Sequence, residues 1–286
     1  MDEERAEPDH GAEVNSTEKQ LLDLYNRCVP ESYRVTGEAF DGLTDGGELF
    51  TRCDGDALIG FALLRQSSLT LLCVDEAYRR RGIGSDLLKQ AEDWAGSHGK
   101  KRLILGHGSD YVIPGVPTEE GAHRFFEKRG YACTGYTYDM TLTLPPEITV
   151  PIPDGVTFDV HPVNDEILAA VEAVEKSWLG VYKSTPEDVL LAKLNGIIAG
   201  FCIPAGWTRF DPDRDAGSVS CVGVLPEYRN RGIGLAMVSE ALRYLTDNGC
   251  TRAELLYTSI PHWYGKLGFV PFHRLWMGEK RLSLRE

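Results

Sequence analysis

Two short segments of the sequence combine arginine and glycine at a spacing suited to binding a phosphate group. Residues 78–84 have the sequence YRRRGIG and residues 228–234 have YRNRGIG, so each contains Arg-x-x-Gly-x-Gly. Glycine allows backbone conformations and a close ligand approach that a side chain would block. Apolar residues at helical spacing follow each segment, and the N–H groups at the start of a helix suit a pyrophosphate. Each segment is therefore a candidate phosphate site, although a simple tight turn also uses such glycines.

The two segments belong to a repeat that extends along most of the chain. Residues 71–88 align without a gap with residues 221–238, an offset of 150 (221 − 71). Both copies continue to similar endings, FFEKRGY at 125–131 and WYGKLGF at 263–269. A motif that occurs twice in matching context favours a functional role over a chance turn. The spacing excludes a Rossmann fingerprint, which needs G-x-G-x-x-G, and a Walker loop, which needs Gly-Lys-Ser/Thr.

Hydrophobic patterning places each motif between a strand and a helix. Short apolar or β-branched runs predict strands, and apolar residues at helical spacing predict the helix after each glycine pair. Strands interleaved with helices predict an α/β or α+β sheet in each half. The predicted strands are 56–65, 68–74 and 101–107 in the first half and 195–204, 218–224 and 252–258 in the second, and the predicted helices are 82–98 and 232–248.

A proline-rich segment separates the two copies. Residues 144–155, LPPEITVPIPDG, contain four prolines, which disfavour a helix and predict an extended connector. We therefore expect a first domain at 18–145, a linker at 146–153 and a second domain at 154–286. The acidic residues 1–17 are expected to be a disordered tail.

The composition of the chain limits the classes of binding partner that are expected. The 286 residues carry a net charge of -13, which argues against nucleic acid and anionic membranes, because both need a basic surface. No apolar run has transmembrane length. The seven cysteines are odd in number and lack metal or redox spacing, and the histidines are scattered, so we expect no metal. Free, mostly buried thiols in a reducing cytoplasm are expected.

The motifs of both halves resemble those of the GCN5-related N-acetyltransferase (GNAT) family. The resemblance covers nearly the whole chain after the tail. It implies two tandem domains, each a mixed, mostly antiparallel sheet flanked by helices with a splayed acetyl-CoA cleft. In that family the glycine turn holds the acetyl-CoA pyrophosphate, and the preceding strand pairs with the pantetheine arm. The cofactor-binding residues that this implies are Val74, Arg79, Gly82 and Gly84 in the first half and Val222, Val224, Arg229, Arg231, Gly232 and Gly234 in the second.

One aromatic position distinguishes the two halves. Tyr264 of YGKLGF occupies the position from which the family tyrosine protonates the leaving thiolate, whereas the first half has Phe126, which has no proton to give. We therefore expect the second half to be catalytic and the first not, although Tyr264 is also explained by core packing. Glu254, on a predicted strand, is the candidate base, with a solvated surface carboxylate as the alternative. A backbone N–H on the strand before the turn is expected to stabilise the oxyanion.

The acceptor is expected to be a small-molecule amine. The Phe126 substitution, the PGVP loop at 114–117 and the competent second half resemble the glucosamine and glucosaminide N-acetyltransferases, which implies an amino-sugar acceptor. Mycothiol synthase, another tandem member, also handles an amino-sugar conjugate. Peptide, polyamine and aminoglycoside acceptors remain open, as does a non-catalytic acyl-CoA sensor or scaffold. Asp211, Asp213 and Asp215 form an acidic loop that either holds a cationic amine or is plain surface. A homodimer is compatible with the sequence.

Overall fold

The computed structural model describes residues 16–37, 40, 46–105, 113, 115–119, 121–208 and 215–282. The predicted tail lies almost wholly outside these residues, as do Asp211 and Asp213. The chain divides into two compact units. The first contains the described residues up to Leu103, and the second contains most of the rest, from Ile113 to Lys280.

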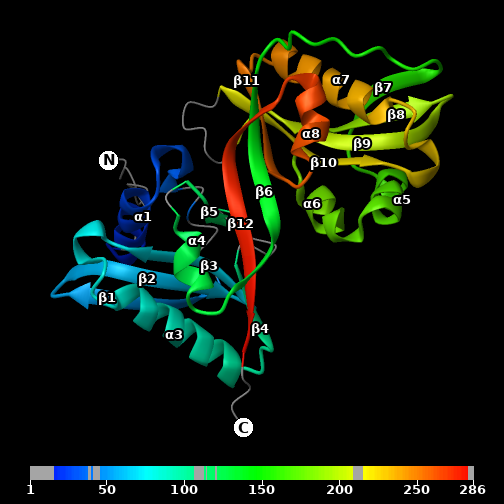
Figure 1. The fold of residues 1–286 in the computed structure, drawn as a ribbon. Coiled ribbons are helices and arrows are strands. Elements are labelled where there is room, and N and C mark those ends of the chain that lie inside the picture. The colour runs from blue at the N-terminus through cyan, green and yellow to red at the C-terminus, as the bar shows by residue number, and fades with distance from the viewer. Residues whose placement is uncertain are drawn as a thin grey trace, which may run out of the picture. The chain divides into compact units, whose positions relative to one another are not determined.

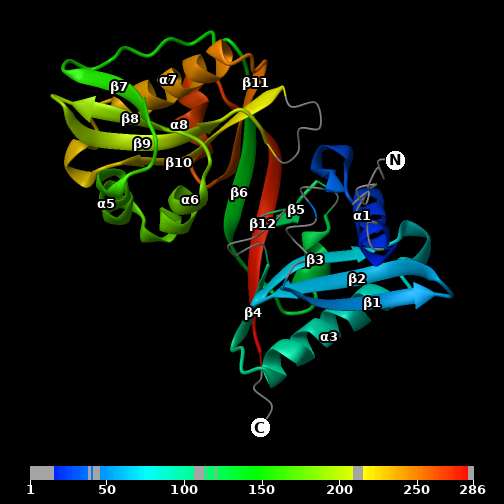
Figure 2. The same ribbon diagram turned by 180° about the vertical axis from the view of Figure 1, so that it is seen from behind.

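The first unit is a small antiparallel sheet with helices packed on it. Its strands follow the order β1-β2-β3, and both α1 and α3 pack against β2 (Figure 2). Residues 58–64 of β2 are buried without a break, as expected for a strand covered on both faces. The elements are α1 (Ser16–Cys28), η1 (Glu31–Tyr33), β1 (Glu48–Asp54), β2 (Ala57–Arg65), β3 (Ser68–Val74), η2 (Glu76–Tyr78) and α3 (Ile83–Ser97), and β4 (Arg102–Leu105) is divided between the units.

The second unit is a larger sheet in which one strand pair is parallel. Its order is β12-β6-β11-β10-β9-β8-β7, with β5 paired to β12, and β10 and β11 are the parallel neighbours (Figure 1). The strands are β5 (Val116–Pro117), β6 (Ala132–Thr143), β7 (Val156–His161), β8 (Val189–Leu194), β9 (Ile197–Ala205), β10 (Ala216–Val224), β11 (Arg252–Thr258) and β12 (Val270–Arg281). The helices are α4 (His123–Glu127), α5 (Asp165–Val174), η3 (Lys176–Trp178), α6 (Leu179–Ser184), η4 (Pro226–Tyr228), α7 (Ile233–Asp247), α8 (Pro261–Tyr264) and η5 (Gly265–Leu267).

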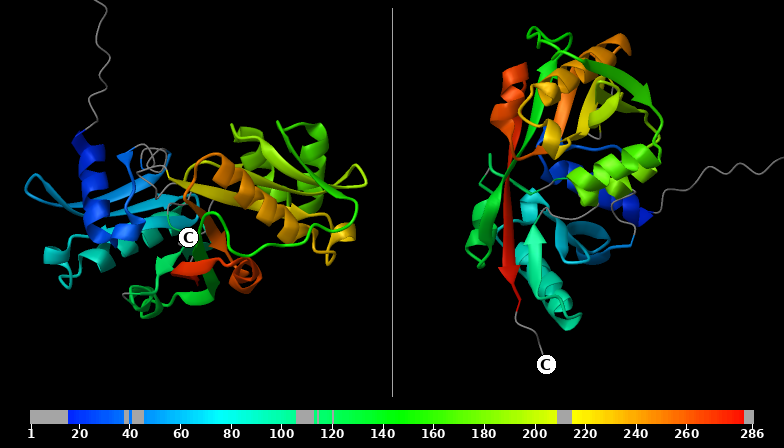
Figure 3. Two further views of the ribbon diagram at one scale, coloured as in Figure 1. Left: turned by 90° about the horizontal axis from the view of Figure 1, so that it is seen from above. Right: turned by 90° about the vertical axis from the view of Figure 1, so that its right-hand side faces the viewer.

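Helices lie on both faces of this larger sheet (Figure 3), and each face has its own hydrophobic cluster. On one face Met237 and Leu245 of α7 pack with Val219 of β10. On the other face Tyr182 of α6 packs with Phe201 of β9, beside residues of α5. Each large apolar side chain buried in this way contributes about 1.5–3 kcal/mol. The sheet around β10 is therefore firmly held from both sides.

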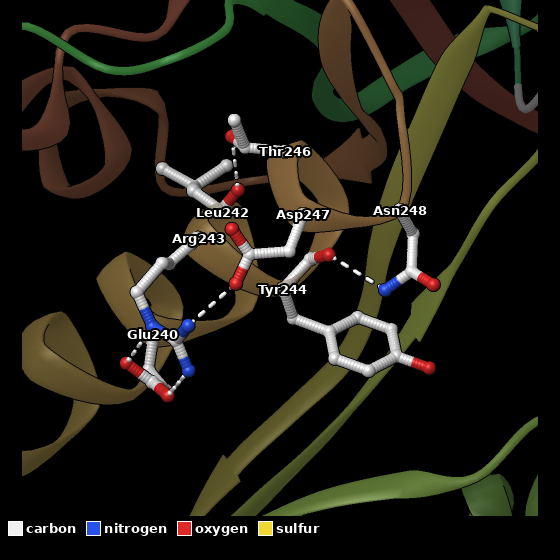
Figure 4. Close-up of polar contacts among 7 residues, drawn as sticks. All are labelled: Glu240, Leu242, Arg243, Tyr244, Thr246, Asp247 and Asn248. Carbon is white, nitrogen blue, oxygen red and sulfur yellow. Dashed lines mark hydrogen bonds and ion pairs between the residues drawn. The ribbon is translucent and has the colours of Figure 1, made fainter.

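Helix α7 ends in a set of polar contacts at its C-terminus (Figure 4). The carbonyl oxygen of Tyr244 accepts both the backbone N–H of Asn248 at 3.1 Å and the side-chain amide of Asn248 at 2.8 Å. Arg243 bridges Glu240 and Asp247 on the exposed face. Surface pairs of this kind contribute little stability each, about 0.3–0.5 kcal/mol. At the opposite end of α7, beside the glycine turn, no side chain forms a capping hydrogen bond with Gly232 as the N-cap residue.

The last strand of the first repeat is built into the sheet of the second repeat. Strand β6 pairs antiparallel with β11 on one side, where Thr141 faces Glu254, and with β12 on the other, where Asp139 faces His273. Figures 1 and 2 both show β6 and β12 running side by side. The compact units therefore do not coincide with the two repeats in the sequence, and the domain bounds at 18–145 and 154–286 remain a prediction.

The local predictions agree closely with the observed elements. The predicted strand 68–74 is β3 itself, and the predicted helices 82–98 and 232–248 differ from α3 and α7 by one residue at each end. The linker 146–153 contains no helix or strand. None of the helices within the described residues is long and apolar enough to cross a membrane.

The expectation about cysteine burial was wrong. All seven thiols are free, but only Cys73, Cys202 and Cys250 are buried, while Cys53 and Cys133 are exposed. Cys53 lies on β1, which has one strand neighbour in its unit, and Cys133 lies at the start of β6. An apolar sequence context therefore did not predict burial at the ends and edges of strands.

Candidate functional site

The two glycine turns have the same backbone conformation. Gly82 and Gly232 precede α3 and α7 with φ of +88° and +79°, in the left-handed region. Two residues earlier, Arg80 and Asn230 also have positive φ, +65° and +61°. A side chain at either glycine would be strained, because L-residues other than glycine rarely adopt this region. Both turns therefore present the N–H groups of a helix start, which is the geometry expected for a bound pyrophosphate.

An arginine ties each turn to the end of the preceding strand. Arg79 Nε donates to the carbonyl oxygen of Val74 at 3.1 Å, and Arg229 Nε donates to that of Val224 at 3.0 Å. The predicted strand-end and turn residues are thus brought together in both halves. The bond fixes the turn relative to the strand on which the rest of a nucleotide-linked ligand would lie.

The helix starts after the two turns differ in charge. Helix α3 has Asp86 in its first turn, whereas α7 has no acidic residue there and carries Ala236 at the matching position (236 − 86 = 150). A carboxylate at a helix start interacts favourably with the dipole and so repels a second anion. The second turn is therefore better suited than the first to a pyrophosphate.

Strands β10 and β11 separate next to the second turn. Their parallel pairing covers three residue pairs and ends where Ser218 faces Glu254. Beyond that point β10 continues to Val224 and β11 to Thr258 without pairing to each other. Val222 and Val224, predicted to contact the cofactor, lie on this separated part of β10. Backbone N–H and C=O groups along such an edge are available to an extended ligand.

Strand β10 contains a bulge within this separated part. Its register against β9 shifts between Ser220 and Gly223, so Cys221 and Val222 together face one residue, Cys202. Cys221 has φ of +49°. A bulge leaves backbone groups outside the ladder and re-aims them. In β3 the matching residues 71 and 72 pair one for one with β2, and the register shift falls one position earlier, at Thr70, so the two halves place the irregularity at different residues.

Tyr264 lies buried beside the bulge. It is 8% exposed and belongs to the same core cluster as α7, with its ring edge-on to Trp263 and Phe269. Burial raises the pKa of the Tyr264 hydroxyl well above its ordinary value, and the nearby thiols of Cys202 and Cys221 raise it further. The hydroxyl is therefore protonated at neutral pH, as a proton donor must be. Packing and a donor role are both compatible with this position.

Glu254 is buried rather than solvated, so the surface-carboxylate alternative was wrong. The residue is 5% exposed, and its Oε1 accepts from Arg252 Nε at 3.3 Å. Its Oε2 is buried without a partner. Arg252 also bonds Asp215, the described member of the acidic loop, at 2.7 Å. A buried carboxylate oxygen without a partner is costly and suits a ligand that donates a hydrogen bond.

Tyr264 and Glu254 belong to opposite faces of the sheet. Ala253 and Leu255 on β11 are part of the core that contains Tyr264, and side chains alternate along a strand, so Glu254 points to the other face. The pairing of β10 with β11 ends at Glu254, so the two strands are unpaired beyond this residue. This arrangement suits a reaction in which an acceptor approaches from one face and a leaving group departs on the other.

Several polar residues at this site carried no sequence signal. Tyr182 on α6 bonds the backbone of Cys221, and Asp139 on β6 bonds the backbone of Tyr257 on β11. These partners are 39 and 118 residues apart in the chain. Local periodicity cannot find such contacts. Among the described residues there is no cluster of three or more His, Cys, Asp or Glu side chains that could hold a metal ion.

A strand, glycine turn and helix, together with a splayed parallel pair and a buried tyrosine, form a site of the kind expected for an acyltransferase that uses an acyl-CoA. The model of the acetyltransferase (GNAT) family matches residues 18–131 and 159–269. The chain therefore belongs to the GNAT family, contains two tandem copies of its domain, and is an acetyltransferase.

Relatives and solved structures support this assignment. Mycothiol acetyltransferase of Pseudarthrobacter chlorophenolicus is 27% identical over 255 residues, covering 76% of this chain and 72% of that protein. A glucosamine N-acetyltransferase region of a fungal multi-domain β-N-acetylglucosaminidase has a TM-score of 0.81 at 19% identity, covering 93% of this chain and 37% of that longer one. A tandem GNAT protein from the clavulanic acid pathway has a TM-score of 0.73 at 18% identity, covering 96% and 97%.

Proposed function

We propose that the second half transfers the acetyl group of acetyl-CoA directly to the primary amine of an amino sugar or an amino-sugar conjugate. The observation that carries the proposal is the position of Tyr264, buried with its hydroxyl beside the β10 bulge, where the first half has Phe126. The unpaired oxygen of Glu254 on the other face of the same strand gap supports it.

The residues around the second glycine turn fit acetyl-CoA. Arg229, Arg231, Gly232 and Gly234 surround a helix start without side-chain caps, which suits the pyrophosphate. A Cβ on Gly234 would lie 3.1 Å from the Trp263 ring, so a side chain there would crowd that ring. The separated edge of β10 offers backbone groups to the pantetheine arm, the family role of Val222 and Val224. Acetyl-CoA supplies the acetyl thioester to be attacked.

Three groups of this chain have complementary roles in the transfer. Glu254 accepts a hydrogen bond from the acceptor amine and takes the proton that the amine must lose. Backbone N–H groups at the bulge stabilise the negative charge that develops on the thioester oxygen. Tyr264 donates a proton to the departing thiolate. An acid on one face and a base on the other separate the two proton transfers in space.

The nearby cysteine does not favour a covalent acetyl-enzyme. Burial raises the pKa of the Cys221 thiol to about 11, so the thiol is protonated at neutral pH. The thiolate is the nucleophilic form, so Cys221 is a weak competitor of an incoming amine. This supports direct attack rather than transfer through the protein.

The first half is proposed to be non-catalytic. Val74, Arg79, Gly82 and Gly84 keep the phosphate-turn geometry, but Asp86 disfavours an anion at the helix start. Phe126 is buried and packs edge-on against Tyr131, which satisfies the core without a hydroxyl. The stoichiometry of an acetyl-CoA titration tests whether this half binds as well as the second, because two occupied halves give two sites per chain.

The amino-sugar acceptor rests on two independent likenesses. One group of relatives is named for mycothiol acetylation, and the fold neighbour with a TM-score of 0.81 is named for glucosamine N-acetylation. Both names point to amines attached to sugars. Peptides, polyamines and aminoglycosides are the competing acceptors.

The test is release of CoA thiol from acetyl-CoA with a panel of amines. The panel contains glucosamine, a chitobiose-type glucosaminide, an aminoacyl glucosaminide, a peptide, spermidine and an aminoglycoside. We expect the highest kcat/KM with a sugar amine and at least a tenfold loss of kcat in Tyr264→Phe and in Glu254→Gln. Tyr131→Phe, which removes a buried hydroxyl from the first half, is the matched control and should keep wild-type kcat.

Other outcomes separate the parts of the proposal. Turnover with spermidine or peptide but with no sugar amine would contradict the amino-sugar acceptor and would still support the acetyltransferase activity. A wild-type kcat in Tyr264→Phe would show that Tyr264 is not the proton donor to the departing thiolate. Acetylated protein detected by mass spectrometry on Cys221 during turnover would replace direct attack with a covalent route.

A further inference from the structure

A buried tyrosine on α6 holds the bulge of β10. Tyr182 is 0% exposed, and its hydroxyl donates to the carbonyl oxygen of Cys221 at 2.9 Å. Its ring packs edge-on against Phe201 with centroids 5.5 Å apart. The bond joins a short helix to the strand residue whose φ is +49°. Tyr182 therefore contacts the most irregular point of β10 without belonging to the strand.

The bulge needs an external partner. Cys221 and Val222 together face one residue of β9, so one peptide unit is left outside the ladder. A left-handed backbone conformation in a residue other than glycine persists only where surrounding structure imposes it. Burial raises the pKa of the Tyr182 hydroxyl, which therefore remains a donor at every working pH. The bond to Tyr182 satisfies the Cys221 carbonyl and fixes the plane of the peptide that continues into Val222.

The matching strand of the first half has its irregularity one position earlier, where Thr70 is the extra residue between Leu69 and Leu71. At the positions that match Cys221 and Val222, Leu71 and Leu72 pair one for one with β2. The first half does contain a comparable buried bond, from the Tyr25 hydroxyl to the carbonyl oxygen of Tyr33 at 2.7 Å, but that bond joins α1 to η1. A tyrosine bonded to the backbone thus occurs in both units, and the bond from Tyr182 is made to the strand that precedes a glycine turn.

We propose that Tyr182 is a positioning residue for acetyl transfer. Its hydroxyl holds the Cys221 carbonyl so that a backbone N–H of the bulge points at the thioester carbonyl oxygen of bound acetyl-CoA. The proposal rests on the proposed function for the identity of the ligand. It assigns Tyr182 no contact with either substrate.

The experiment compares wild type with Tyr182→Phe and with Tyr25→Phe as the matched control. Both changes remove one hydroxyl from a fully buried ring and keep its packing. The first measurement is the infrared carbonyl band of [1-13C]acetyl-CoA bound to the full chain, which moves to lower frequency when an N–H bonds the oxygen. The second is the affinity for CoA by titration calorimetry. The third is kcat at saturating acetyl-CoA and acceptor.

We expect the band shift in wild type and in Tyr25→Phe, and its loss in Tyr182→Phe. CoA affinity should change less than threefold, because the pyrophosphate turn is untouched, while kcat falls at least tenfold. Removing an oxyanion donor costs about 100-fold to 1000-fold, and a misdirected donor should lose part of that. Addition of Cys221→Gly to Tyr182→Phe should recover part of kcat, since glycine adopts the left-handed conformation without a clamp.

Each alternative outcome is decisive. Retention of both the band shift and kcat in Tyr182→Phe overturns the inference and leaves the proposed function intact. Equal losses in Tyr182→Phe and Tyr25→Phe overturn it as well, because they indicate a general loss of stability. A wild-type protein whose bound acetyl-CoA shows no band shift overturns it without any variant. If the wild type shows the band shift but turns over no amine, the proposed function fails; loss of the band shift in Tyr182→Phe would then support only the part of the inference that concerns the position of the thioester carbonyl.

Discussion

Replacement of Asp139 should destabilise the second unit far more than replacement of an exposed aspartate. Asp139 and His273 are 0% and 3% exposed, and Asp139 Oδ2 lies 3.1 Å from His273 Nδ1. The other carboxylate oxygen accepts the backbone N–H of Tyr257 at 2.9 Å. Tyr257 has φ of +64° and lies where the register of β11 against β6 shifts. A single carboxylate thus holds the adjacent β12 and the bulge of β11.

The magnitude follows from burial. Removing one partner of a buried, hydrogen-bonded pair costs about 3–5 kcal/mol, since the other partner stays desolvated. For a unit of this size each kcal/mol lowers Tm by about 2–4 °C, so Asp139→Ala should lower it by about 6–20 °C. Asp139→Asn keeps an acceptor for the Tyr257 N–H, so its Tm should fall less than that of Asp139→Ala. Asp159 pairs with Lys193 at 2.8 Å on the surface, and Asp159→Ala should cost about 1 kcal/mol or less.

Thermal unfolding monitored by circular dichroism, with urea titration at 25 °C, measures all three variants. The expected order of loss is Asp139→Ala, then Asp139→Asn, then Asp159→Ala. A Tm for Asp139→Ala within 2 °C of the Asp159→Ala value would refute the reasoning, because it would show that the buried pair contributes no more than a surface pair. An unchanged urea midpoint in Asp139→Ala would refute it in the same way.

Two further predictions concern the thiols and the second glycine turn. Iodoacetamide should label Cys28 before Cys221, because a hydrogen bond from Cys73, aided by Arg79, lowers the pKa of Cys28, while burial raises that of Cys221 to about 11. The thiolate reacts, so Cys221 labelling should accelerate as pH rises toward 11, and equal rates at pH 8 by peptide mass spectrometry would contradict this. Gly232→Ala forces a side chain into φ of +79°, costing about 1–2 kcal/mol, and should lower Tm by about 2–8 °C and weaken CoA binding. Calorimetry that shows unchanged affinity would contradict the role of the turn.

The parts of the fold that depend on neighbouring residues could be predicted from the sequence. Strand β3 and helices α3 and α7 follow from apolar spacing over windows of a few residues, and the turns follow from glycines that need positive φ. The environment of Glu254 could not be predicted this way. Its burial depends on the strands that flank β11, one of which, β6, comes from the other repeat. A repeat in sequence indicates a repeated fold but does not say which strand of which copy completes each sheet.

Two buried polar contacts of the second unit lie where its strands depart from regular pairing. Tyr182 bonds the bulge of β10, and Asp139 bonds the bulge of β11, on the two strands that separate beyond Ser218 and Glu254. A buried polar group is costly unless it is bonded, so such groups persist where an irregular backbone supplies the partners. In β3 the residues that match Cys221 and Val222 pair one for one with β2, and the extra residue lies one position earlier, at Thr70. We therefore interpret the two buried clamps as the means by which the second half keeps β10 and β11 apart beyond Ser218 and Glu254.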